Sequence, residues 1–344
     1  MVGDPAFPNA SARAAQGRAR ADARLRGMVD DLFLPQDARL SERTRLTLAR
    51  LLTDTVGGIE VELRRQAARV LADKGAVAAA EALLAGNGAA ERLSAAGLLR
   101  DEALIGALIA WVQHREIADA LPAVVNGPDE ASLLVRLSGT PDRVVAAAAR
   151  ALLVADSAAG VFLPAEVQHR LIWWVAAAIR PALDDADVDR AVADAAWRSL
   201  GAHEEGDGIG AAAMRLASAI DARTDELAPL LLEALGDRRL SLFIAVLAHA
   251  TSLHFDQAEA LVIEPDGERL WLALRAINLD RSTIARIALA LSDADPRRDI
   301  EAFADRLDII AAADPAEARD ALAPETLAKD FRVAIRVLHR TERS

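Results

Sequence analysis

Cysteine is absent from the 344 residues of this chain, and so is tyrosine. Without cysteine the protein cannot form disulfides, bind a metal through thiolates or use a cysteine nucleophile. No uninterrupted apolar run approaches the length that spans a bilayer, and the first residues contain no apolar segment like that of a signal peptide. The sequence therefore predicts a soluble, cytoplasmic protein with no place in a membrane.

Lysine is nearly absent, since only Lys74 and Lys329 occur, and arginine supplies almost all the positive charge. The formal net charge is −12. Residues 1–75 hold 13 Arg and Lys against 10 Asp and Glu, a net charge of +3, so the remaining chain carries −15. Nucleic-acid binding needs many cations on phosphates. The acidic body therefore argues against a nucleic-acid partner.

Alanine, leucine, arginine and glutamate are abundant, and these residues lose little side-chain entropy in a helix. Ser41 can cap a helix over residues 42–54. The pair Gly57–Gly58 is expected to separate it from a second helix over residues 59–74, which Gly75 closes. No segment shows the alternation of a strand bounded by hairpin turns.

Short stretches with Gly, Pro and Asp separate the predicted helices and indicate how the chain is organised. Residues 1–10 are expected to be disordered, residues 11–75 to form an N-terminal helical segment, and residues 76–340 to form a helical-repeat domain. Successive helices of about 10–17 residues joined by short links are typical of a solenoid of helix pairs. We therefore predict an all-α fold, an irregular HEAT-like helix-pair solenoid with an N-terminal helical segment.

Two adjacent tryptophans, Trp173 and Trp174, stand in one predicted helix. At 100° per residue they cannot both face a core squarely. Trp174 falls on the apolar stripe, whereas Trp173 falls on the opposite side with His169 and Arg170. Two interpretations of Trp173 stay open: it packs on a neighbouring repeat, or it is a partly exposed anchor for a partner protein.

Two further tryptophans pose the same question, namely Trp197 and Trp271. Trp271 lies one turn before Arg275, at a spacing that allows a cation–π contact. The candidate partner-binding residues are therefore Trp173, His169, Arg170, Trp197, Trp271 and Arg275.

No motif supports catalysis, a cofactor or a metal. Gly206–Ala211 matches a phosphate-binding glycine pattern, but a predicted helix rather than a strand precedes it. Asp185, Asp187 and Asp189 lack the glycine and glutamate of a calcium loop and suit a helix N-terminus better. His249 and His254 do not have the spacing of two ligands on one helix face. We predict no catalytic, cofactor or metal residues and no cofactor.

Two stretches resemble a bacterial helical-repeat family known as domain of unknown function 2336. Residues Leu40–Ala72 resemble its opening, a capped helix followed by a helix that ends in a run with Arg65, Ala68–Arg69 and Leu71–Ala72, and Leu240–Ile287 is similar to its C-terminal repeats. The resemblance runs from about residue 25 to 310, with residues 90–160 departing most. It implies a HEAT-like helical fold and supplies no catalytic residues.

The leading functional hypothesis is a non-catalytic scaffold or regulatory adapter that binds a protein partner. The acidic loop His203–Asp207 favours a basic partner. The alternative is a helical-repeat nucleic-acid-binding protein or enzyme that uses a concave groove. Its best support is a run of arginines, Arg13, Arg18, Arg20, Arg24 and Arg26. A third hypothesis is a homodimer through the N-terminal helix, where residues 25–34 leave an apolar patch.

Overall fold

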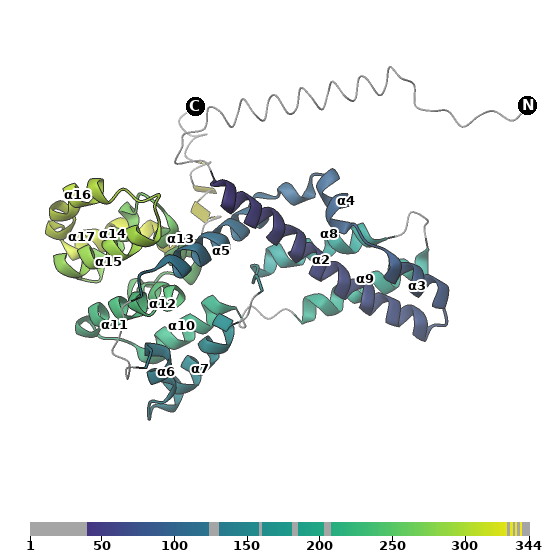
Figure 1. Ribbon diagram of the computed structural model, residues 1–344, viewed down its shortest axis with the longest axis horizontal. Helices are drawn as coiled ribbons and strands as arrows, with labels where there is room; N and C mark the ends of the chain where they lie inside the picture. Colours follow the sequence, from purple (N-terminus) through teal and green to yellow (C-terminus); the bar gives the residue numbers. More distant parts are fainter. Residues whose placement is uncertain are drawn as a thin grey trace, which may run out of the picture. The chain divides into compact units, whose positions relative to one another are not determined.

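The computed structural model describes residues 40–123, 131–157, 160–180, 185–202 and 208–328, with residues 331–332, 334–335 and 338. Every regular element within these ranges is a helix. The predicted all-α fold class is thus confirmed for the described part of the chain (Figure 1). By its contacts the chain divides into two compact units, Met1–Leu46 and Thr47–Ser344. The predicted domain limits stay predictions.

Three predictions fall on residues 1–39, which lie outside the described ranges: the disorder of residues 1–10, the arginine run and the apolar patch of residues 25–34. The acidic loop His203–Asp207 lies outside them too. The helices in chain order are α2 (Glu42–Asp73), α3 (Val77–Ala85), α4 (Ala89–Ala95), α5 (Glu102–Ala120), α6 (Leu133–Ser138), α7 (Arg143–Ser157), α8 (Ala165–Ile179), α9 (Ala186–Gly201), α10 (Ile209–Ile220), α11 (Thr224–Gly236), α12 (Leu240–Thr251), α13 (Phe255–Ile263), α14 (Glu268–Ala276), α15 (Arg281–Ala294), α16 (Ile300–Ala312) and α17 (Pro315–Leu322).

Helix α2 begins where the sequence predicts, because the Ser41 hydroxyl accepts a hydrogen bond from the Thr44 N–H at 3.1 Å. The predicted break at Gly57–Gly58 is wrong: α2 runs through both glycines as one helix of 32 residues. Glycine in a helix interior costs about 1 kcal/mol relative to alanine. Here the buried stripe that includes Val56, Leu63 and Leu71 outweighs that cost.

The two glycines of α2 offer a direct test of this interpretation. Nothing lies within 4 Å of a Cβ built on either Gly57 or Gly58. Gly57→Ala and Gly58→Ala should each raise the free energy of unfolding by about 0.5–1 kcal/mol. Gly75, at φ +80°, is the matched control, since alanine there is strained and should destabilise. Urea unfolding of the three variants gives the comparison, and a loss of stability from Gly58→Ala would contradict the continuous helix.

The buried apolar side chains form two clusters. One draws on α2, α3, α4, α8 and α9. The other draws on α6, α7 and the helices from α10 to α17. Helix α5 contributes to both, with Leu104 and Leu108 in the first cluster and Ile117 in the second. Helices α7 and α10 pack directly on each other, so the α8–α9 pair is inserted in the sequence between two neighbours.

Three successive helix pairs, α10–α11, α12–α13 and α14–α15, share a feature of their turns. A residue with positive φ follows the first helix of each pair: Asp221 at 45° directly after α10, Ser252 at 58° directly after α12, and Asn278 at 63° two residues after the end of α14. The second helix has its N-cap two residues later, at Arg223, His254 and Asp280. A left-handed residue that ends one helix and turns the chain into the next is a repeated structural unit. This is consistent with the predicted solenoid of helix pairs.

Candidate functional site

The predicted aromatic residues of α8 and α9 form a continuous surface, which we call the aromatic ridge: His169, Trp173 and Trp197. The Trp173 and Trp197 rings lie 5.3 Å apart, centroid to centroid, at an interplanar angle of 82°. Trp173 donates its indole N–H toward His169 Nε2 at 3.4 Å, and these two rings lie 6.4 Å apart. The edge-to-face arrangement of the two indoles is a favoured geometry for aromatic pairs.

The local sequence explains how the ridge is built. Pro164 stands at the N-cap of α8, and the apolar stripe from Val167 through Leu171 to Val175 is buried. Helix α9 begins at Asp185, whose carboxylate accepts hydrogen bonds from the N–H groups of Asp187 and Val188. Because α8 and α9 pack side by side, their outward faces lie next to each other. The predicted helix N-terminus at Asp185 is confirmed.

The ridge combines a half-buried tryptophan with an exposed one. Trp173 is half-buried and packs against the first apolar cluster, whereas the Trp197 residue is 62% exposed. Trp174 is half-buried against the same cluster. Trp173 therefore has features of both interpretations, since it packs on its own protein and also supports an exposed aromatic side chain. Whether the ridge binds a partner stays a prediction.

The charged neighbours of the ridge are mostly engaged within the protein. Arg170, exposed beside His169, pairs with Asp101 at 3.1 Å. At the C-terminal end of α8, Arg180 forms a two-point ion pair with Asp189, at 2.5 and 2.6 Å. These contacts tie α8 to the start of α5 and to α9. The exposed Trp197 indole is then the main group of the ridge that a partner could contact.

The structure places the other two candidates in a different environment. Trp271 is 3% exposed and packs on Phe303 with ring centroids 4.6 Å apart. Arg275 donates to the carbonyls of Ala313 and Leu279 at 2.7 and 3.1 Å. The described residues show a cation–π contact of Arg115 with Trp111, at 6.0 Å, and none between Arg275 and Trp271. Trp271 is therefore a core residue and Arg275 ties helix ends together.

Two glycines of the phosphate-like motif, Gly208 and Gly210, have a packing explanation. A Cβ on Gly208 would lie 2.8 Å from the Phe162 ring, and one on Gly210 would lie 2.7 Å from the Phe255 ring. A side chain at either position would require the neighbouring aromatic ring to move, because the rings lie close against the backbone at the start of α10. Helix α9 precedes this segment, as predicted.

No group of three or more potential metal ligands gathers among the described residues. His254 is the N-cap of α13, and the end of α12 separates it from His249, so the two histidines do not share one helix face. His249 instead lies 3.1 Å from the Asp221 carboxylate.

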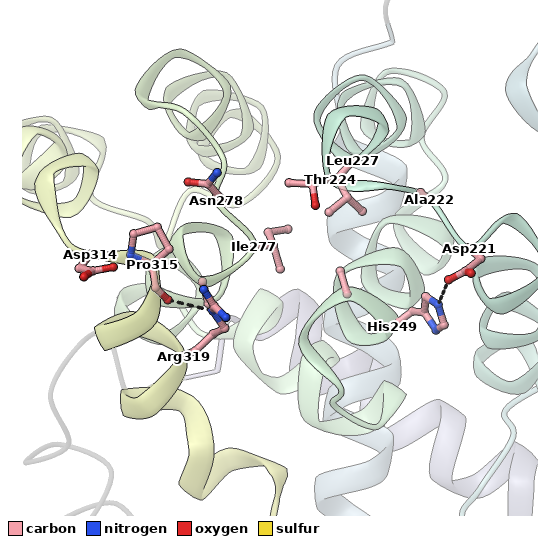
Figure 2. Close-up of a pocket in the computed structure, with 12 residues that line it drawn as sticks. Asp221, Ala222, Thr224, Leu227, His249, Ile277, Asn278, Asp314, Pro315 and Arg319 are labelled. Carbon is pink, nitrogen blue, oxygen red and sulfur yellow. Dashed lines mark hydrogen bonds and ion pairs between the residues drawn. The ribbon is translucent and has the colours of Figure 1, made fainter.

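A shallow groove lies where the repeat turns meet α17 (Figure 2). Its volume is about 620 Å³. Asp314 and Pro315 lie on one side, Asp221 and His249 lie on the other, and Ile277 lies between them. We call this the turn groove. No sequence pattern indicates this groove, because its residues come from four separate turns that only the packing of the repeats brings together.

A buried hydrogen-bonded chain joins α5, α12 and α13. His114 Nδ1 lies 2.6 Å from Glu259 Oε1, and His114 Nε2 lies 2.9 Å from Ser241 Oγ. With the Nδ1–H donating to the Glu259 carboxylate, a neutral imidazole accepts from the Ser241 hydroxyl. This is the order of a Ser–His–Glu catalytic triad. However, His114 and Ser241 are each only 6% exposed, so we assign the chain of hydrogen bonds to helix packing.

The described residues contain no helix that is both long and apolar enough to cross a membrane. The searches of curated proteins and of solved structures returned no match. The model of the family described as uncharacterised protein conserved in bacteria (DUF2336) matches residues 140–323, more than half of the chain. That range includes Leu240–Ile287 and extends into the part expected to depart, whereas Leu40–Ala72 lies outside it. The chain belongs to this bacterial family, domain of unknown function 2336.

Proposed function

We propose that the protein is a non-catalytic scaffold or adapter that binds a protein partner through the aromatic ridge. The observation that carries the proposal is Trp197, an indole that is 62% exposed and stacked edge-to-face on Trp173. An exposed large aromatic side chain is informative, because single exposed aliphatic residues are common on any surface. The HEAT-like character of the repeats and a cytoplasmic location are part of the proposal.

The ridge has the physical properties of a binding anchor. Tryptophan is among the residues that dominate interface energies, since it buries a large area while losing little conformational freedom. Trp173 packs against the apolar cluster, and its ring supports the Trp197 ring from one side. A partner that covers Trp197 would remove the exposed indole from water. Burial of apolar surface stabilises a complex by about 25 cal/mol for each Å².

Site-specific photocrosslinking in the bacterium that encodes the protein tests the proposal. A benzophenone amino acid replaces Trp197 in one strain and Ile309 in a second. Ile309 lies on α16 and is 73% exposed, so it is a matched apolar control. We expect a discrete crosslinked protein from position 197 that is missing from position 309. The absence of any adduct at position 197, or the same adducts at both positions, would contradict the proposal.

A further inference from the structure

We propose that Asn87 is a site of spontaneous deamidation, and that its isoaspartate product loosens the link between α3 and α4. This modification site lies outside the aromatic ridge, and the inference does not depend on the proposed function. Asparagine is a thermolabile residue. The backbone nitrogen of the residue that follows it is the group that attacks its side chain, so the surroundings of that nitrogen decide how readily the reaction occurs.

Asn87 and the nitrogen next to it are both accessible. Gly86, Asn87 and Gly88 connect α3 to α4 outside any helix, and the Asn87 side chain is exposed. Within the described ranges, neither the Asn87 amide nor the Gly88 N–H has a hydrogen-bond partner. Glycine has no side chain to shield its nitrogen and leaves the peptide plane free to turn. The two reacting groups are therefore unengaged and adjacent.

The reaction needs only water as a second reactant. The Gly88 nitrogen loses its proton to solvent and forms a bond to Asn87 Cγ, while the bond from Cγ to Nδ2 breaks and ammonia leaves. The product is a cyclic succinimide. Water then adds to one of the two ring carbonyls and opens the ring, which gives either aspartate or isoaspartate. Overall one amide and one water become one carboxylic acid and one ammonia.

Asn278 is a matched internal control, because its neighbouring nitrogen is engaged. The Leu279 N–H donates to the Leu274 carbonyl at 3.2 Å, and Leu279 is only 3% exposed. The Asn278 side chain also accepts a hydrogen bond from Arg275 Nη1 at 3.5 Å. Attack at Asn278 would first have to break these contacts. We therefore expect Asn278 to keep its amide under conditions that convert Asn87.

The link that contains Asn87 is anchored at both ends to one buried ion pair of α2. Arg64 Nη1 donates to the Leu83 carbonyl at 2.8 Å, and Glu60 Oε2 accepts from the Ala89 N–H at 3.1 Å. Between these anchors the backbone passes close over the guanidinium, since a Cβ built on Gly86 would lie 2.6 Å from Arg64 Nη1. The length of the link therefore matters for both anchoring contacts.

Isoaspartate changes this link in two ways. The chain then runs through the former side chain, which adds one carbon to the backbone between the two anchors. A new carboxylate also appears beside an existing one, because Glu91 Oε2 lies 3.4 Å from a Cβ built on Gly88. Both changes oppose the contacts with α2, so the modified protein should hold α3 and α4 less firmly.

Peptide mass spectrometry of the aged full chain tests the modification. The purified protein is kept in a mildly alkaline buffer, which favours loss of the Gly88 proton, and is then digested with trypsin. The peptides of residues 75–92 and 276–281 each contain one asparagine and no glutamine, so each reports one site. Protein L-isoaspartyl methyltransferase identifies isoaspartate by transferring a methyl group to it.

We expect Asn87 to convert at least about tenfold faster than Asn278 and to become a substrate of the methyltransferase. Equal rates at the two sites, or an unchanged Asn87, would overturn the proposed site.

Urea unfolding of the aged protein tests the consequence for the link. Asn87→Gln is the control variant, because glutamine would have to close a larger ring and its exposed side chain fits the same place. We expect aged wild type to unfold at a lower urea concentration than fresh wild type, in proportion to its isoaspartate content, and Asn87→Gln to unfold alike before and after ageing. Equal changes in the two proteins would overturn the claim that isoaspartate loosens the link.

Discussion

Arg64→Leu should lower the free energy of unfolding by about 3–5 kcal/mol, because it leaves a buried carboxylate without its cation. The Arg64 and Glu60 side chains are only 9% and 10% exposed. Arg64 donates from Nε and Nη2 to Glu60 Oε1 at 2.9 and 2.7 Å. Its Nη1 donates to the Leu83 carbonyl at 2.8 Å, while Glu60 Oε2 accepts from the Ala89 N–H at 3.1 Å. One ion pair of α2 thus provides hydrogen-bond partners for a backbone carbonyl at the end of α3 and a backbone N–H at the start of α4.

The neighbouring arginine is a matched control for this prediction. Arg65 is 59% exposed and pairs with Glu62 at 3.0 Å. Arg65→Leu should change stability by less than about 1 kcal/mol, since exposed ion pairs contribute little. Urea unfolding with far-ultraviolet circular dichroism measures both variants. Equal effects of Arg64→Leu and Arg65→Leu would show that the buried pair does not hold α3 and α4 to α2.

His114→Leu should cost about 2–4 kcal/mol, since it leaves the Ser241 hydroxyl and the Glu259 carboxylate without their shared partner. Ser241→Ala should cost about 1 kcal/mol, because it removes one hydrogen bond and leaves the His114–Glu259 contact in place. The same unfolding measurement gives both values.

These two variants also test the assignment of this chain of hydrogen bonds to packing rather than catalysis. If it acted as a catalytic triad, the wild-type protein would hydrolyse an activated ester such as p-nitrophenyl acetate, and folded Ser241→Ala would lose that activity. We expect the two proteins to give the same rate. A rate that Ser241→Ala abolishes would contradict the structural assignment.

The sequence predicted the features that depend on local chemistry. The all-α class follows from composition, and the caps at Ser41 and Asp185 follow from side chains that reach the next N–H groups. The clustering of Trp173 with His169 follows from their spacing of four residues on one helix. Such features need only a few neighbouring residues.

The features that sequence reasoning missed depend on distant partners. Gly57 and Gly58 predict a break, but packing of the long stripe that contains Leu63 overrides their propensity. Glu60 and Arg64 look like an ordinary exposed helical pair until α3 and α4 cover them. The partners of His114 lie more than a hundred residues away in the sequence.

Trp271 shows the limit of spacing as a criterion. Its four-residue separation from Arg275 allowed a surface cation–π pair, but Phe303 of α16 covers the ring. Trp197, with a similar sequence environment of alanines and an arginine, stays exposed because no later helix of the described residues covers it. Only the packing of the whole chain distinguishes the two tryptophans.

The most direct test of the proposed function is the dissociation constant of the partner captured at position 197, measured by calorimetry for the wild-type protein and for Trp197→Ala. Circular dichroism first establishes that the variant is folded. An interface anchor should give a loss of at least about 2 kcal/mol, or roughly thirtyfold in affinity. An unchanged dissociation constant would contradict the claim that the aromatic ridge is the binding surface.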